Sequence, residues 1–79
     1  MLIKVKYFAS LKEKTGLPEE IINFDGESAS DLYAFLKNKY HFPLLSDSLM
    51  VAINDEYVEM EEILNEGDLV VFIPPVAGG

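Results

Sequence analysis

One long amphipathic helix is predicted near the middle of this chain, and it limits the folds that the sequence can adopt. Ser28 and Asp31 form a capping-box pattern at its N-terminus, and Pro43 follows its C-terminus. Apolar side chains recur at helical spacing between them, at Ala29, Leu32, Tyr33, Leu36 and Tyr40. The 79 residues contain no second helix pattern of this length, so strands have to cover the apolar face of this helix.

Strand patterns flank the helix on both sides. Residues 2–8 alternate between Ile3, Val5 and Tyr7 on one face and mostly lysine on the other, which is typical of a half-buried strand. The other predicted elements are a short helix within 9–16, strands at 18–24, 49–53, 57–58 and 69–73, and a helical turn within 60–64.

This order of elements predicts an α+β fold, a roll in which a mixed sheet wraps around one main helix. The first and last strands are long and apolar, so we expect them to form a central, parallel pair. We expect residues 1–73 to form the domain and residues 74–79 to form an extended, flexible C-terminal tail.

The last strand has two apolar faces, and both need an explanation. If Val70 and Phe72 point toward the helix, then Val71 and Ile73 point away from it, onto the sheet face where the first strand presents Phe8. We interpret Phe8, Val71 and Ile73, joined by Tyr57 from the neighbouring hairpin, as a partner interface. The alternative is chance exposure of single apolar side chains.

The tail combines stiffness at its base with very small residues at its end. Pro74 and Pro75 cannot donate backbone hydrogen bonds, so they end the strand ladder and favour an extended conformation. Residues 74–79 reach roughly 20 Å, far enough to enter a deep active site on another protein. Gly78 and Gly79 have no Cβ, so a narrow channel can close around them, and the carboxylate of Gly79 is the reactive group. The alternative is that the two glycines are incidental.

The distribution of charge narrows the classes of partner. The formal net charge is -8, and seven acidic residues with no lysine among them fall within residues 55–68. This acidic segment is either a solvated surface or a surface for partner docking. Arginine is absent and the pI is about 4.3, which argues against a nucleic-acid partner.

Other absences bear on location and catalysis. The chain has no cysteine, and its N-terminus alternates instead of forming a signal peptide or a membrane span, so we expect a cytoplasmic protein with no membrane partner. The single histidine, His41, has no aligned nucleophile in the sequence. We therefore expect that the chain is no enzyme by itself and binds neither a metal nor a cofactor.

These motifs resemble the MoaD family, the sulfur-carrier small subunits of molybdopterin synthase, which are ubiquitin-like β-grasp proteins. The similarity extends over nearly the whole chain and is carried by "VKYFASLKEKTG", "ESASDLYAFL", "VAIND" and "LNEGDLVVFIPPVAGG". The last segment is the most specific, because sulfur carriers of the thiamine pathway share the Gly-Gly but usually lack the Pro-Pro-Val. Ala77 departs conservatively from the small hydroxylated residue that is frequent there.

The resemblance implies a sulfur-transfer cycle. An adenylating enzyme related to ubiquitin-activating enzymes would use ATP to activate Gly79, and sulfur from a donor would then displace AMP to give a C-terminal thiocarboxylate. Pro74, Pro75, Val76, Ala77, Gly78 and Gly79 would enter the active site of the large synthase subunit, in a heterotetramer of two small and two large subunits. There the sulfur would be added to cyclic pyranopterin monophosphate during molybdenum cofactor biosynthesis.

Three other functions remain open from the sequence. A protein modifier would join Gly79 to lysines through isopeptide bonds. A carrier for another pathway, such as the thiamine pathway, would use the same thiocarboxylate. A plain interaction domain would bind non-covalently, with no chemistry at the tail.

Overall fold

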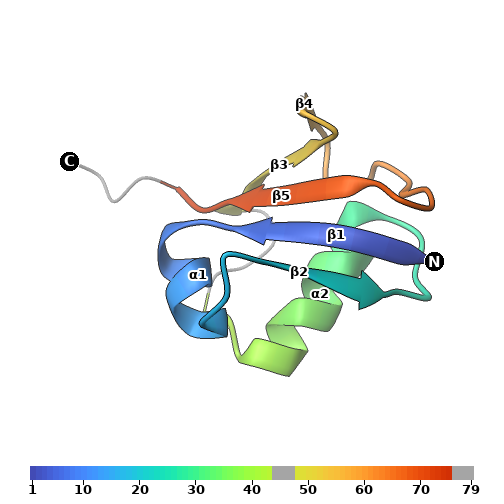
Figure 1. Cartoon of the computed structure of the whole chain (residues 1–79). Helices are drawn as coiled ribbons and strands as arrows, with labels where there is room; N and C mark the ends of the chain where they lie inside the picture. Colours follow the sequence, from blue (N-terminus) through green and yellow to red (C-terminus); the bar gives the residue numbers. More distant parts are fainter. Residues whose placement is uncertain (44–47, 76–79) are drawn as a thin grey trace.

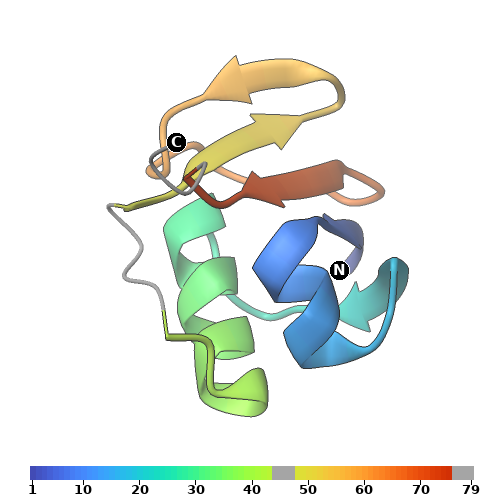
Figure 2. The ribbon, with the colours of Figure 1, turned by 90° about the vertical axis from the view of Figure 1, so that its left-hand side faces the viewer.

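A five-stranded mixed sheet packs with one face against a long helix, as the α+β prediction requires. The computed structural model describes residues 1–43 and 48–75. Its elements are β1 (Leu2–Tyr7), α1 (Ala9–Thr15), β2 (Glu19–Asn23), α2 (Ala29–Tyr40), β3 (Met50–Ile53), β4 (Glu56–Val58) and β5 (Leu69–Ile73). Figures 1 and 2 show α1 and α2 on the same side of the sheet.

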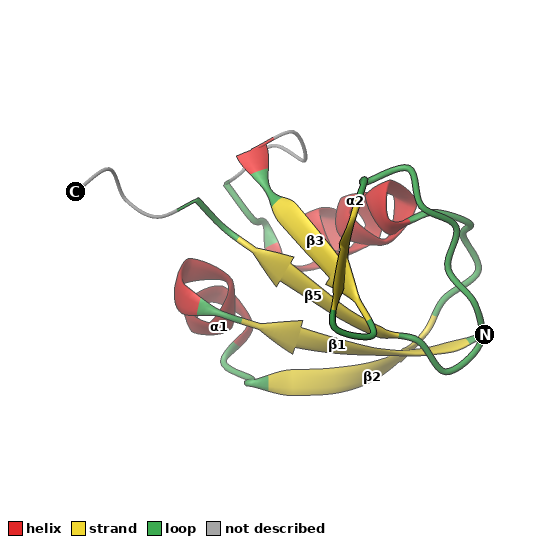
Figure 3. Ribbon diagram, turned by 90° about the horizontal axis from the view of Figure 1, so that it is seen from above, coloured by secondary structure: helices red, strands yellow, loops and turns green. Residues whose placement is uncertain are grey.

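The strand order β2-β1-β5-β3-β4 confirms the expected pairing of the first and last strands. β1 and β5 run parallel, with Val5 opposite Val70 and Tyr7 opposite Phe72. The other neighbours are antiparallel. In the view from above, the strands lie in front of α2, and within the described residues no helix covers this second face (Figure 3). We call it the outer face.

The core lies between α2 and the inner face of the sheet. The predicted helical stripe is buried at Ala29, Leu32, Tyr33 and Leu36. The Tyr33 ring lies 5.3 Å from the Phe72 ring of β5, measured between centroids, and 5.7 Å from the Phe42 ring. These aromatic contacts fix the depth of β5 against the helix.

The start of α2 is capped as the sequence predicts. Asp31 N donates to Ser28 Oγ at 3.1 Å, and Ser28 N donates to Asp31 Oδ2 at 3.1 Å. The backbone N–H groups of Ser28 and Glu27 hold the pKa of the Asp31 carboxyl below its usual range. The capping box thereby fixes where the helix begins.

The end of α2 is held to the sheet by one carboxylate. Tyr7 Oη and Tyr40 Oη both donate to Glu20 Oε2, at 2.6 and 2.5 Å. Burial and the Glu20 carboxylate raise the pKa of Tyr7 above its usual range and raise the pKa of Tyr40 to about 12. Glu20 therefore links β1, β2 and the last turn of α2.

The possible helical turn predicted within 60–64 is reduced to a single turn, in which Glu62 N donates to Glu59 O at 3.0 Å. This segment makes a turn at residues 60–61, and Ile63 then forms an isolated antiparallel bridge with Ser28. Its backbone carbonyls accept hydrogen bonds from the first residues of α2. Ala29 N donates to Glu62 O at 2.9 Å, and Ser30 N donates to Met60 O at 2.7 Å. The N–H groups of the first turn of α2, which have no partner within the helix, thus donate to these carbonyls. The carbonyls are then not available for helical hydrogen bonds within 60–64.

Candidate functional site

The base of the tail follows directly from β5. Ile73 is the last residue of β5, Pro74 is buried and Pro75 is exposed. Proline has no N–H to donate, so the ladder ends here as expected. Val76, Ala77, Gly78 and Gly79 lie outside the described residues. The division into a domain and a flexible tail at residue 74 stays a prediction.

The predicted interface residues lie on the outer face of the sheet. Val70 and Phe72 are fully buried against the core, whereas Val71 and Ile73 are half-buried on the opposite face. Phe8 is 50% exposed. It directly follows the buried Tyr7 and has an extended backbone as the N-cap residue of α1, so strand alternation turns its side chain to the outer face.

Tyr57 joins this surface through strand pairing. Ala52 lies between Val71 of β5 and Tyr57 of β4 in the register of the sheet, so the side chains of all three project from the outer face. Tyr57 is 69% exposed. The structure therefore brings the four predicted residues to one face, from β4, β5 and the end of β1; their contact with a partner stays a prediction.

The sequence prediction missed one residue of this surface. Met50 is 56% exposed and lies directly opposite Ile73 in the antiparallel β3–β5 pair. The alternation of residues 49–53 could have indicated it, because Val51 is buried and its neighbour Met50 must face the other way. We call Phe8, Met50, Tyr57, Val71 and Ile73 the outer-face cluster.

The acidic segment divides into exposed and structural carboxylates. Six of its acids are exposed: Asp55, Glu56, Glu59, Glu61, Glu62 and Glu66. Asp68, in contrast, is buried. Asp68 Oδ1 accepts from Asn54 Nδ2 at 2.9 Å, and Asp68 Oδ2 accepts from Asn65 N at 2.8 Å. Asp68 therefore does not belong to a solvated surface, because it ties two turns together.

The described residues hold no catalytic constellation. His41 is exposed in a left-handed conformation at the C-cap of α2, and no group of three or more metal-ligating side chains occurs within 1–43 and 48–75. The assignment of the chemistry to the carboxylate of Gly79, which lies outside the described residues, stays a prediction.

Comparison with known families identifies the chain. A family model described as the ThiS family matches residues 5–79, which is almost the entire sequence. The chain belongs to the ThiS family. The match includes both the strands that carry the outer-face cluster and the Gly-Gly end.

Curated relatives of this ThiS-family chain have a more specific name. A molybdopterin synthase sulfur carrier subunit from Chlamydomonas reinhardtii is 41% identical, over 100% of both chains. A protein with the same name from Escherichia coli is 31% identical, over 99% of this chain and 100% of its own.

Solved structures support the β-grasp fold. A putative molybdopterin converting factor subunit 1 from Pyrococcus furiosus matches with a TM-score of 0.77 and 30% identity, over 95% of this chain and 98% of its own. Small archaeal modifier protein 1 of Haloferax volcanii matches with a TM-score of 0.78 and 26% identity, over 95% and 98%. A chain in a complex of subunits 1 and 2 of the molybdopterin-converting factor from Helicobacter pylori matches with a TM-score of 0.68 and 25% identity, over 100% of both chains.

The two helices also bear on membrane insertion. Neither α1 nor α2, the helices of the described ranges, has the length and apolar character needed to cross a bilayer.

Proposed function

We propose that this chain is the sulfur-carrier small subunit of a molybdopterin synthase. The observation that carries the proposal is the full-length similarity to curated sulfur carrier subunits, at 41% identity with no part of either chain left over. The Helicobacter pylori structure supports a large subunit as the partner, since it is a complex of subunits 1 and 2.

The proposed chemistry takes place at the carboxylate of Gly79. A carboxylate is a poor electrophile, so an activating enzyme first joins it to the AMP part of ATP and releases pyrophosphate. Sulfide released by a sulfur donor then attacks the acyl carbon, AMP leaves, and a thiocarboxylate results. In this cycle the chain presents its terminus, and the activating enzyme binds ATP.

The domain then delivers the thiocarboxylate to the large subunit. The outer-face cluster docks on that subunit, and residues 74–79 enter its active site, where sulfur passes to cyclic pyranopterin monophosphate. The half-buried Val71 and Ile73 support this placement, because they lie within β5, which continues directly into the tail. We also propose a heterotetramer of two small and two large subunits, located in the cytoplasm.

Mass spectrometry of the intact protein tests the proposal. After incubation with ATP, an activating enzyme and a sulfur donor, we expect the mass to rise by the difference between one sulfur and one oxygen. Removal of Gly79 should abolish this change and leave the unfolding curve unaltered. Full molybdopterin formation by the truncated protein would contradict the proposal.

The same reaction mixture separates the alternative functions. The similarity to small archaeal modifier protein 1 supports a second candidate function, in which the activated carboxylate is joined to other proteins. Isopeptide-linked ladders on other proteins would support a modifier. A thiocarboxylate that transfers sulfur only to a thiazole precursor would support the thiamine pathway. An unchanged mass would leave only a non-covalent interaction domain.

A further inference from the structure

The β3–β4 hairpin forms one side of a groove that the proposed sulfur transfer does not use. The groove has a volume of about 540 Å³. Its apolar lining residues are Leu49, Met50, Val51, Tyr57, Val58 and Met60. Two carboxylates, Glu59 and Glu62, complete the lining.

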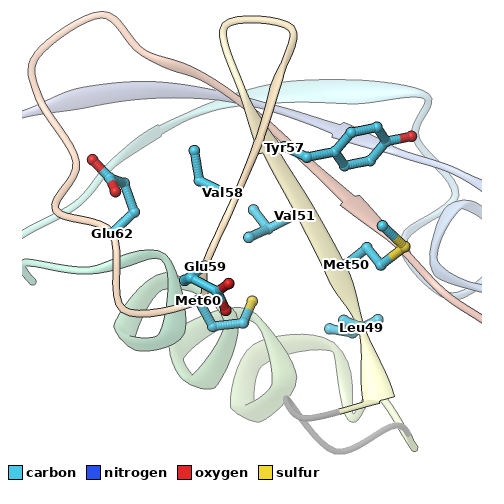
Figure 4. Close-up of a pocket in the computed structure, with 8 residues that line it drawn as sticks. All are labelled: Leu49, Met50, Val51, Tyr57, Val58, Glu59, Met60 and Glu62. Atoms are coloured by element: carbon cyan, nitrogen blue, oxygen red, sulfur yellow. The ribbon is translucent and has the colours of Figure 1, made fainter.

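The groove is continuous with the outer-face cluster. Met50 and Tyr57 belong to both, and Figure 4 shows their side chains on the same side of the hairpin. Glu62 lies on the other side of the hairpin, on the loop that follows β4 (Figure 4). A partner that covers Ile73 and Met50 can therefore contact the groove and the outer-face cluster through one contiguous interface.

The charge of the groove is not balanced by this chain. Glu59 and Glu62 are exposed, and so are their neighbours Glu56 and Glu61. The sequence has no lysine after Lys39, and the ion pair found in the described part of the chain, between Lys4 and Glu19, lies on β1 and β2. Within the described residues, Glu59 and Glu62 form no ion pair with a lysine of this chain, so a cation supplied by a partner can pair with them.

The lining also suits a long cationic side chain. Lysine and arginine place an apolar stem along apolar surface while the charged head reaches an acidic rim. The exposed ring of Tyr57 offers a face for a guanidinium or ammonium group, and the flexible Met50 adapts to the shape of a partner.

We propose that this groove receives a segment of the large subunit in which a lysine or arginine stands beside an apolar side chain. The inference rests on the proposed function. The outer-face cluster is proposed to dock on the large subunit, and the groove adjoins that cluster, so the large subunit is the partner that can contact it. The cationic side chain pairs with Glu59 and Glu62, and the apolar one packs beside it against Val58 and Met60.

Charge reversal in the groove tests this assignment. In a double variant, Glu59→Lys with Glu62→Lys, we expect the Kd for the large subunit to rise at least about 30-fold, mainly through a slower association rate. The isosteric pair Glu59→Gln with Glu62→Gln should raise the Kd less and reduce its dependence on salt.

A matched control has the same change in net charge at another place. Glu13→Lys with Asp25→Lys alters two exposed acids that neither line the groove nor belong to the outer-face cluster. Its Kd should stay within about threefold of the wild-type value. The midpoint of thermal unfolding, measured for each variant, tests whether the fold is kept.

The outcomes separate this inference from the proposed function. Failure of the wild-type chain to bind the large subunit or to deliver sulfur overturns both. Normal sulfur delivery with groove variants that bind within threefold of wild type overturns the inference alone. A defect confined to thiocarboxylate formation assigns the groove to the activating enzyme, and it also overturns the inference. Selective loss of large-subunit binding supports it.

Discussion

Replacement of Ile73 by aspartate tests whether the outer-face cluster is the docking surface. Ile73 is half-buried beside Met50 and directly precedes the prolines of the tail. A charge at the centre of an interface loses its hydration and finds no partner there. The expected penalty is roughly 2 to 5 kcal/mol, so Ile73→Asp should weaken the Kd for the large subunit at least about 30-fold.

The same substitution costs the fold much less. Full burial of an isoleucine contributes about 1.5 to 3 kcal/mol, so a half-buried one contributes about 1 kcal/mol. Aspartate adds up to about 1 kcal/mol because it disfavours strands. A small domain with about 5 to 15 kcal/mol of stability remains folded after this loss.

Ile21→Asp is the matched control. Ile21 is 68% exposed on the outer face of β2, opposite Lys4, which in turn lies opposite Leu69 of β5. It is therefore two strands away from β5 and level with the first residue of that strand, far from the tail. Its affinity should stay within about threefold of wild type.

Isothermal titration with the large subunit, together with urea unfolding of each variant, separates the two effects. Wild-type affinity for Ile73→Asp would refute the docking assignment. Equal losses for Ile73→Asp and Ile21→Asp would refute it as well, because a general effect of negative charge would then explain both.

Three further predictions concern the tail, a turn and the tyrosines. Gly78→Ala should lower thiocarboxylate formation and large-subunit affinity, since a methyl group in a channel fitted to glycine costs more than the roughly 0.4 to 1 kcal/mol gained by stiffening the free chain; unimpaired values in both assays would contradict this. Gly26→Ala should destabilise the fold by about 1 to 3 kcal/mol in urea unfolding, because the new Cβ overlaps the buried ring of Phe24, whereas an unchanged midpoint would show that the ring moves freely. The free energy of unfolding should fall between about pH 10 and about pH 12, because the unfolded chain loses protons that Tyr7 and Tyr40 retain in the fold, and a flat profile in urea titrations would contradict the Glu20 network.

The sequence predicts the fold well where local signals agree with tertiary packing. The capping box of Ser28 and Asp31 sets the start of α2, and the helical stripe sets its buried face. The alternation of β1 and β5 likewise places Val5 and Val70 in the core. Each of these signals is contained within one element, so it can be interpreted without knowledge of its neighbours.

The errors occur where the deciding contact is distant in the sequence. Residues 60–64 have helix-forming side chains, but their carbonyls are taken by N–H groups of α2 about 30 residues earlier. Asp68 is indistinguishable by type from the exposed acids before it, and only its bonds to Asn54 and Asn65 keep it buried. The alternation of residues 49–53 indicates the face of Met50, but its place opposite Ile73 depends on the register of β3 against β5.

The packing of Phe72 connects the core with the proposed function. Its ring contacts Tyr33 on α2, and its partner in β3 is the buried Val51. The helix and the neighbouring strand therefore both hold β5 in its register. A slip of one residue would turn Phe72 outward and bury Val71 and Ile73. The same slip would change where Pro74 leaves the sheet. The inner face of β5 therefore determines which side chains meet a partner and from which point the tail extends toward it.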